Sequence, residues 1–271
     1  MGIDFQSLDP PSDWELPSAT VEEFRSRSGD YCVLIPVLNE GQRIKDQLTY
    51  MKDLPGLPDV IICDGGSSDG CTESGLMQQL GVTCVIRKTS PGRMSSQLRL
   101  LFAYVLLKGY QGMVHMDGNN KDDPDFLANY VSHLKDGYDC VAGSRFRKGG
   151  QSINTPLYRE LAIRVIHAPL VSLAAGRRFS DTTNSYRGYS RRLIEDPRIQ
   201  PFRNVFNSYN LPYYLLVRAA RLGFQTTEIP VNRRYPKNEV PSKIKGVRGN
   251  LNILRELFEV MIGACNPPSV T

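Results

Sequence analysis

Residues 31–40 read YCVLIPVLNE, an apolar run that ends in a proline and two polar side chains, Asn39 and Glu40. This pattern is typical of a buried parallel strand whose carboxyl end opens onto a crevice, where ligands bind in α/β sheets. Similar apolar runs follow at 59–63, 82–87, 112–116 and 139–142. Segments with helical spacing lie between them, at 42–52, 71–80, 94–108 and 124–135. The alternation predicts an α/β fold with a mostly parallel, doubly wound sheet flanked by helices.

The pattern changes after residue 143. An Arg-rich segment with helical spacing covers 157–175 and is interrupted by Pro169, and a second helix is expected at 211–222. Strands are expected at 185–190 and 225–231, and an amphipathic helix at 247–262. We therefore expect a polar arm at 1–30 and a single domain at 31–271, whose second half is more helical.

Composition limits the classes of function. The chain has 271 residues, 41% hydrophobic and 23% charged, which is ordinary for a globular protein. Residues 1–142 hold 12 Lys and Arg against 20 Asp and Glu, a net −8, whereas residues 143–250 hold 20 against 6, a net +14. The two halves therefore face different chemistry. Only 9% of residues are aromatic, with no aromatic and basic repeat, which argues against nucleic acid as a partner.

Cysteines and the N-terminal segment indicate the compartment. The six cysteines show no CxxC pair, so we expect reduced thiols that fill the core. Residues 1–30 carry acids and prolines rather than the features of a signal or transit peptide, so a cytoplasmic protein is expected. The apolar stretches are shorter than a membrane span, and any membrane contact would be peripheral.

The loop Asp64-Gly-Gly-Ser-Ser-Asp-Gly70 follows the second apolar run. Its glycines let a base or ribose approach the backbone, and its carboxylates accept hydrogen bonds from them. A capped turn before a helix has the same composition, so both readings stay open.

The fourth run ends in Met116-Asp117-Gly118-Asn119. A carboxylate that leaves a buried strand, with an oxygen-bearing side chain two residues later, suits Mg²⁺ or Mn²⁺ when a diphosphate supplies further ligands. A capped turn leading into Pro124 is compatible with the same residues. His115 lies inside the run and is expected in the core.

In this order, the three strand-end motifs resemble those of the inverting family-2 glycosyltransferases of the GT-A fold. The later segments Gly143–Phe146, Asp181–Arg187, Glu228–Val231 and Ser242-Lys243 resemble the narrower group of polyprenyl-phosphate sugar synthases, typified by dolichyl-phosphate mannose synthase. The resemblance covers roughly residues 31–250. It implies a metal-dependent hexosyltransferase, with residues 31–142 as the nucleotide-sugar half and 143–271 as the acceptor half.

The resemblance also implies site residues. Those expected to bind a UDP- or GDP-linked sugar are Pro36, Asn39, Glu40, Asp64, Ser67, Asp69, Arg93, Asp117 and Gly118. Asp117 takes the first position of the family's Asp-x-Asp metal motif. Asn119 replaces the second Asp, and its amide oxygen is a ligand without charge.

The basic half supplies candidate phosphate ligands, because guanidinium groups form charge-assisted bonds to phosphate oxygens. Arg145, Arg234 and Lys243, together with Asp117, are the catalytic candidates. The acceptor candidates are Asp181, Arg187, Arg233 and Ser242.

The chemical class of the acceptor is inferred from the lack of a carboxylate that could act as general base. A phosphate acceptor is already ionised, whereas a sugar hydroxyl needs a positioned Asp or Glu. Residues 207–210 read NSYN, where hydroxyl-acceptor relatives usually carry acids. Polyprenyl phosphate is therefore favoured, with a saccharide hydroxyl as the alternative if Asp122, Asp123 or Asp181 acts as base. A nucleotidyltransferase ranks lower, since residues 36–40 are not its glycine- and basic-rich loop.

Two helical segments bear on where in the cell the protein is expected. Residues 157–175 and 247–262 have apolar spacing that suits either a membrane surface beside a lipid substrate or an ordinary core. The expected location is the cytoplasm, with association at the inner face of the membrane as a further option.

Overall fold

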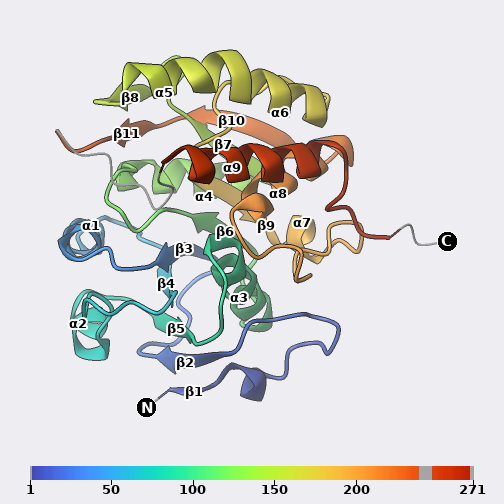
Figure 1. Ribbon diagram of the computed structural model, residues 1–271. Coiled ribbons are helices and arrows are strands. Elements are labelled where there is room, and N and C mark those ends of the chain that lie inside the picture. Colours follow the sequence, from blue (N-terminus) through green and yellow to red (C-terminus); the bar gives the residue numbers. More distant parts are fainter. Residues whose placement is uncertain (1, 238–245, 269–271) are drawn as a thin grey trace.

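The computed structural model describes residues 2–237 and 246–268. Its centre is a nine-stranded sheet with the order β1-β2-β5-β4-β3-β6-β9-β7-β10 (Figure 1). The strands are β1 (Ile3–Asp4), β2 (Ala19–Glu23), β3 (Tyr31–Val37), β4 (Asp59–Asp64), β5 (Cys84–Lys88), β6 (Gly112–His115), β7 (Cys140–Ser144), β9 (Arg187–Ser190) and β10 (Thr226–Pro230). A second, two-stranded sheet pairs β8 (Gln151–Ile153) with β11 (Asn232–Arg234).

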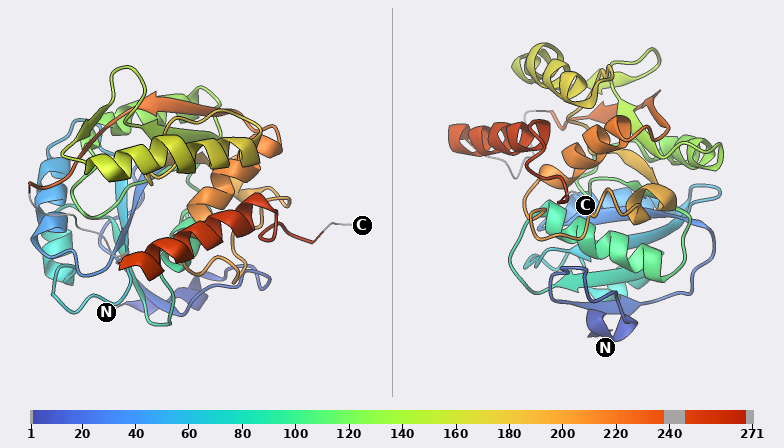
Figure 2. Two further views of the ribbon diagram at one scale, coloured as in Figure 1. Left: turned by 45° about the horizontal axis from the view of Figure 1, so that its top comes forward. Right: turned by 90° about the vertical axis from the view of Figure 1, so that its right-hand side faces the viewer.

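Helices cover both faces of the large sheet (Figures 1 and 2). One face is packed by α1 (Gln42–Lys52), α2 (Ser74–Gln79) and α4 (Leu127–Lys135). The other is packed by α3 (Met94–Leu107), α6 (Ala168–Ala175), α8 (Asn210–Arg221) and α9 (Gly246–Met261). Shorter helical segments are η1 (Phe5–Leu8), η2 (Pro124–Phe126), α5 (Leu157–Ala162), the π-helical η3 (Ile163–His167) and α7 (Arg191–Glu195). The expected α/β fold, a large sheet flanked by helices, is confirmed.

Strands β5, β4, β3 and β6 run parallel, so their carboxyl ends meet at one edge. The strand expected at 185–190 is present as β9, but it runs antiparallel between β6 and β7. An antiparallel strand begins where its neighbours end. The loop that leads into β9 therefore lies at the same edge as Asp117, which follows β6.

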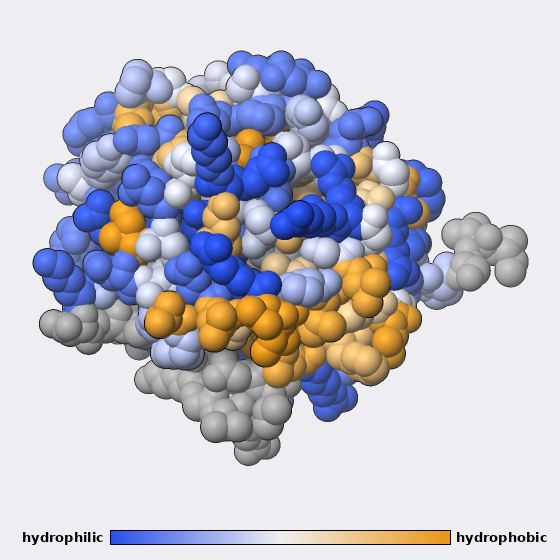
Figure 3. Space-filling view, turned by 90° about the horizontal axis from the view of Figure 1, so that it is seen from above, coloured by the Kyte–Doolittle hydropathy of each residue, from blue (hydrophilic) through white to orange (hydrophobic). Residues whose placement is uncertain are grey.

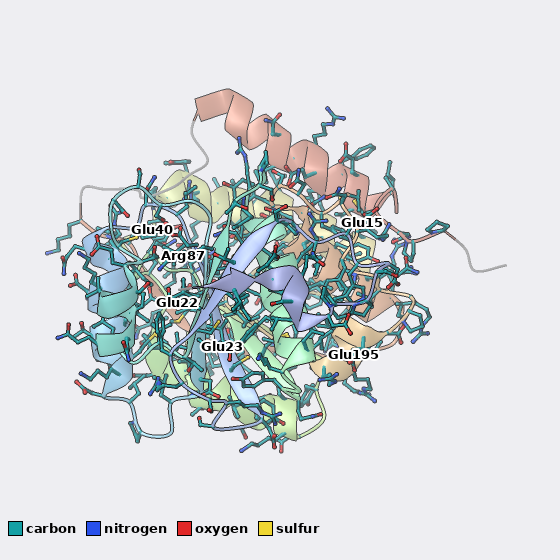
Figure 4. The ribbon with its side chains drawn as sticks, turned by 90° about the horizontal axis from the view of Figure 1, so that it is seen from below. Glu15, Glu22, Glu23, Glu40, Arg87 and Glu195 are labelled. Carbon is teal, nitrogen blue, oxygen red and sulfur yellow. The ribbon has the colours of Figure 1, made fainter. Side chains whose placement is uncertain are left out.

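The arm at 2–30 contains structure that the sequence pattern did not predict. Strand β2 pairs antiparallel with β5 and extends the sheet, with β1 outside it. Arg87 of β5 lies 3.5 Å from Glu22 of β2, measured from Nη2 to Oε2, and Figure 4 shows the two side chains close together. Trp14 stacks on Phe202, with ring centroids 3.9 Å apart. These contacts attach the arm to the sheet and to the second half of the chain.

The helix expected at 157–175 is continuous, and Pro169 does not interrupt it. Pro169 is the second residue of α6, directly after the π-helical turn η3. The i→i+5 pattern of a π turn changes which amides need a partner, so a proline is accommodated there.

All six cysteines lie in the described part of the chain, and all are buried thiols without a disulfide, as expected. Among the described residues, no helix has the length and apolar character needed to cross a bilayer.

Candidate active site

Two loops at the carboxyl edge are linked to each other. The backbone N–H of Asn39 donates to Ser67 Oγ at 2.9 Å, and the Asn39 Oδ1 accepts from the Ser68 N–H at 2.8 Å. The N–H of Gly41 donates to Asp69 Oδ2 at 2.9 Å. Asn39 has a φ of 49°, a left-handed conformation that asparagine tolerates better than most residues. The loops after β3 and β4 therefore form one unit.

Asp64 shapes its own loop. Its Oδ1 accepts from the N–H groups of Gly66 and Ser67 at 3.1 and 2.8 Å, and its Oδ2 accepts from Thr72 Oγ1 at 2.7 Å. The carboxylate is buried, and it fixes the conformation of the glycine-rich turn. These bonds show Asp64 capping the turn, and contact of the loop with a base or ribose stays a prediction.

Asp117 follows β6 at the centre of the same edge. Gly118 packs so tightly against β3 that a Cβ would lie 3.0 Å from Val37 Cγ2 and 3.3 Å from the carbonyl oxygen of Pro36. Gln47 of α1 donates from Nε2 to the Asp117 carbonyl at 3.0 Å, and its Oε1 accepts from the Asn120 N–H at 2.8 Å. The turn is therefore held from both sides.

The Asp117 carboxylate has three protein partners. Its Oδ2 accepts from Arg233 Nη2 at 2.7 Å and from Asn119 Nδ2 at 3.2 Å, and its Oδ1 accepts from Ser185 Oγ at 2.7 Å. Burial alone would raise the pKa of this carboxyl, but neighbouring charges, Arg233 foremost, hold the pKa well below its usual value. Asp117 is therefore an anion at all physiological pH values.

Two buried cations stand beside Asp117. Arg233 also bonds through Nη1 to Asp122, a buried carboxylate whose pKa is raised by burial. The ammonium of Lys121 lies 4.9 Å from the centroid of the Tyr235 ring. Burial, and then the charge of Arg233, lower the pKa of Lys121 to about 8. The cluster thus pairs two carboxylates with two cations.

The residues expected to hold a metal fit it in part. Among the described residues, no group of three or more His, Cys, Asp or Glu side chains is placed to bind an ion. Asp117 supplies one carboxylate, and Asn119 Oδ1 is buried without a hydrogen-bond partner. One carboxylate and one amide oxygen suit Mg²⁺ or Mn²⁺ only when substrate phosphates complete the ligand set, which is usual for Mg²⁺.

The loop before β9 is fixed by a second ion pair. Arg145, at the end of β7, donates from Nε and Nη2 to the two oxygens of Asp181 at 2.7 and 2.9 Å. Both residues are buried. Glu228 of β10 accepts from the N–H groups of Ser180 and Asp181. This network joins β7, β10 and the loop that carries Ser185 to Asp117.

The other expected residues lie in different surroundings. Arg187 is buried in β9 and donates to the carbonyls of Thr182 and Pro212. Arg93 is exposed at the start of α3, with its guanidinium 5.7 Å from the Tyr209 ring centroid. Arg234 is exposed on β11, next to Arg233. Ser242 and Lys243 lie outside the described residues.

Four contributors to the site were not assigned from the sequence: Gln47, Gln97, Lys121 and Ser185. Gln97 of α3 donates to the carbonyls of Val37 and Cys63 at 2.9 and 2.7 Å, and so joins the ends of β3 and β4. Gln47 and Gln97 are fully or nearly fully buried polar residues within apolar helix faces. A glutamine at a helix position where the spacing calls for an apolar residue is the sequence signal that could have identified them.

The sheet's opposite edge carries a shallow surface depression lined by Asp139, Arg192 and Asp196, among others. Asp139 and Arg192 form an ion pair there at 2.7 Å. Parallel sheets bind ligands at the carboxyl ends of their strands, so the candidate site is the edge that holds Asp117.

Comparison with known proteins gives three findings. The sequence profile of glycosyl transferase family 2 matches residues 32–197. Glycosyltransferase AglJ of Haloferax volcanii is 26% identical over 210 residues, which cover 76% of this chain and 63% of AglJ. Polyprenol monophosphomannose synthase of Mycolicibacterium smegmatis is 25% identical over 234 residues, 84% of each chain.

Solved structures share the fold. The crystal structure of glucosyl-3-phosphoglycerate synthase from Mycobacterium tuberculosis, in complex with Mn²⁺, UDP and glucosyl-3-phosphoglycerate, superposes with a TM-score of 0.62. The superposition covers 90% of this chain and 82% of that one, at 16% sequence identity. It shows a common GT-A-like architecture.

Proposed function

The chain belongs to glycosyl transferase family 2 and is a glycosyltransferase, and from this premise we propose that it moves a sugar from a nucleoside-diphosphate sugar, with inversion, to polyprenyl phosphate. The observation that carries the proposal is the cluster at the carboxyl edge of the sheet. There Asp117 lies beside two buried cations, Arg233 and Lys121, and the linked loops after β3 and β4 flank it.

The donor is assigned to the half formed by residues 31–142. Asn39, Glu40, Ser67 and Asp69 lie on the linked loops and Pro36 lies near the end of β3, where a uridine or guanosine and its ribose would contact them. Asp64 keeps its loop in place, and the missing side chain of Gly118 lets the turn after β6 pack closely against β3. Arg93 lies at the start of α3 on the expected path of the diphosphate.

We assign the metal, Mg²⁺ or Mn²⁺, to Asp117 and Asn119 together with the donor diphosphate. When bound, the ion would neutralise charge on the departing nucleoside diphosphate. Lys121 would act on the same charge from the protein side, because a cation placed near developing negative charge stabilises the transition state. The glucosyl-3-phosphoglycerate synthase structure, which holds Mn²⁺ and UDP, supports this assignment.

The acceptor is assigned to the half formed by residues 143–271. An acceptor phosphate oxygen would attack the anomeric carbon while the bond from that carbon to the donor phosphate oxygen breaks. The phosphate is already ionised and needs no base. Arg234, exposed at the edge of the cluster, is the described residue best placed to bind it. The likeness to polyprenol monophosphomannose synthase supports this acceptor.

A hydroxyl acceptor would need one carboxylate as a base, and each of the three candidates already has a hydrogen-bond or ion-pair partner. Asp122 pairs with Arg233, Asp181 pairs with Arg145, and Asp123 accepts from Asn232 Nδ2 at 3.0 Å. This supports the phosphate acceptor over the saccharide hydroxyl. With such an acceptor the enzyme would work at the inner face of a membrane.

Nucleoside diphosphate release from a panel of UDP- and GDP-sugars tests the proposal. It is measured with and without a short polyprenyl phosphate, and with EDTA followed by Mn²⁺ or Mg²⁺. Release that the lipid stimulates, with a lipid-linked sugar as product, is the expected result. Release that does not depend on the lipid but increases with a saccharide would overturn the assignment of polyprenyl phosphate as acceptor. Full activity in EDTA would overturn the assignment of a metal.

A further inference from the structure

The helical rod formed by α5, η3 and α6 has one face without a partner in the described part of the chain. Its inner face is buried, with Ile163, His167, Val171 and Ala174 at most 8% exposed. Its outer face carries seven large apolar side chains that are 37–81% exposed: Leu157, Tyr158, Leu161, Val165, Ile166, Leu170 and Leu173. Figure 3 shows a continuous apolar band on this side of the molecule. A contiguous exposed patch of this kind marks an interaction site.

The π-helical turn places these side chains on one face. An α-helix turns by about 100° per residue, so in an unbroken α-helix Leu173 would lie roughly 160° around the axis from Leu157. A π turn accommodates one extra residue and rotates everything after it back by about 100°. Leu173 then lies within about 60° of Leu157 around the axis. The local distortion therefore joins two short apolar faces into one stripe.

Helix α9 adds a second apolar stripe. Leu257 and Val260 face the core, whereas Leu254 and Phe258 are 44% and 59% exposed, and Ile262, directly after the helix, is 63% exposed. Helix α9 packs beside α6, and both lie on the same side of the molecule (Figures 1 and 2). The two stripes together form what we call the apolar face: the exposed apolar residues of 157–173 and of α9.

Charge around the apolar face favours one kind of partner. Residues 143–180 contain seven Lys and Arg but a single acid, Glu160. Arg147 and Lys148 are exposed before the rod, and Arg177 and Arg178 are exposed after it. Exposed aliphatic and aromatic side chains flanked by basic residues are typical of helices that lie in the interface of an anionic membrane.

We propose that the apolar face docks on an anionic lipid bilayer, with its side chains at the boundary between headgroups and acyl chains. The docked rod would lie directly above the active site. Arg159 Nη1 bonds to the Tyr235 hydroxyl at 3.2 Å, and the Tyr235 ring contacts Lys121 in the cluster around Asp117. Docking itself does not depend on the proposed function. The proposed function only explains why the rod lies above the active site, which is access to a lipid phosphate.

Vesicle co-sedimentation of the full chain tests the proposal. The vesicles are phosphatidylcholine with about one third phosphatidylglycerol, and they contain neither donor nor polyprenyl phosphate. Leu161→Gln is expected to lower partitioning about tenfold, and Leu161→Gln with Leu173→Gln about a hundredfold, because each removes an inserted leucine. Ile3→Gln is the matched control, since Ile3 is 51% exposed on β1 at the far end of the sheet. Pure phosphatidylcholine is expected to bind at least tenfold less.

Vesicle binding that the two leucine changes leave intact, or an equal loss of binding in Ile3→Gln, would overturn the docking surface. Absence of vesicle binding would overturn it as well. If binding is absent and Leu161→Gln dissociates a dimer in sedimentation equilibrium, the apolar face belongs to a second copy. Transfer to detergent-dispersed polyprenyl phosphate without vesicle binding refutes docking alone. Vesicle binding without transfer to that lipid refutes the proposed acceptor and supports docking.

Discussion

Replacing Asp117 by asparagine removes one negative charge from the centre of the site and keeps the side chain's shape. Asp117 accepts from Arg233 at 2.7 Å, from Ser185 at 2.7 Å and from Asn119 at 3.2 Å. In Asp117→Asn, Arg233 keeps only Asp122 as an anionic partner. Any bound cation loses its one charged protein ligand. The change should therefore affect both stability and turnover, to different degrees.

The structure sets the magnitudes. Loss of one hydrogen bond to a charged partner costs about 1.5–3 kcal/mol of the free energy of unfolding. For a chain of this size that lowers Tm by roughly 3–10 °C. Turnover should fall at least ~10²-fold, equivalent to ~2.7 kcal/mol in the activation barrier.

Asp139→Asn is the matched control. Asp139 is 1% exposed and accepts from Arg192 Nε and Nη2 at 2.9 and 2.7 Å, but at the opposite edge of the sheet. We expect it to lose similar stability and to keep turnover within about threefold of the wild type. The assays are urea unfolding and sugar transfer, with turnover corrected for the folded fraction. Near-normal turnover in Asp117→Asn, or an equal loss in Asp139→Asn, would refute the assignment of Asp117 to the chemistry.

The pH dependence of stability gives a second readout for Asp117→Asn. The pKa of Asp117 is lowered from its ordinary 3.8, so the ionised carboxylate stabilises the fold at all pH values above that. This contribution is lost as the pH falls below about 3.8 through the lower pKa of the folded state. The difference in free energy of unfolding between wild type and variant should therefore shrink in acid. A difference that stays constant down to the acid transition would contradict the ion pair.

Three further predictions concern other parts of the molecule. Because the pKa of Lys121 is lowered to about 8, affinity for the nucleoside diphosphate should weaken as the pH rises through that value. In Lys121→Met, affinity should be about tenfold lower at neutral pH and should lose this dependence, as calorimetric titration would show. Arg234→Ala should raise the acceptor KM about tenfold and leave the donor KM unchanged. Arg198→Ala, a change at a distant and exposed arginine, is the control. A raised donor KM with an unchanged acceptor KM would place Arg234 on the donor. Trp14→Ala should remove about 2 kcal/mol of stability by breaking the stack on Phe202, without changing transfer per folded molecule. An unchanged urea midpoint would show that the arm contributes no stability.

Periodicity predicted most of the large elements, because strands and helices buried against each other need apolar residues at fixed spacing. The strands at 31–37 and 59–64 and the helix at 94–107 are present close to their expected bounds. The strands β1 and β2 were missed because they are short and have mixed polar side chains, and β1, at the edge of the sheet, has only two residues. Edge strands are exposed on one side and lose the apolar signal.

The basic half shows where sequence reasoning stops. The net charge of +14 predicted phosphate ligands, yet Arg145 and Arg233 both form buried ion pairs with carboxylates, and Arg187 donates to backbone carbonyls. A guanidinium has the same sequence signature whether it meets a substrate phosphate or a protein carboxylate. Its partner depends on contacts such as Arg233 with Asp122, which are 111 residues apart in the chain.

The sequence by itself determined the layered α/β fold and the positions of Asp64 and Asp117 at strand ends, because local patterns encode burial and because strands that alternate with helices run parallel. Only the tertiary structure decided which side chains surround Asp117. The antiparallel insertion of β9 between β6 and β7 brings Ser185 to it, and the pairing of β11 with β8 brings Arg233. The π turn that aligns the exposed leucines of 157–173 is likewise a property of the folded helix, since a strict α-helical reading of the same residues divides them between two faces.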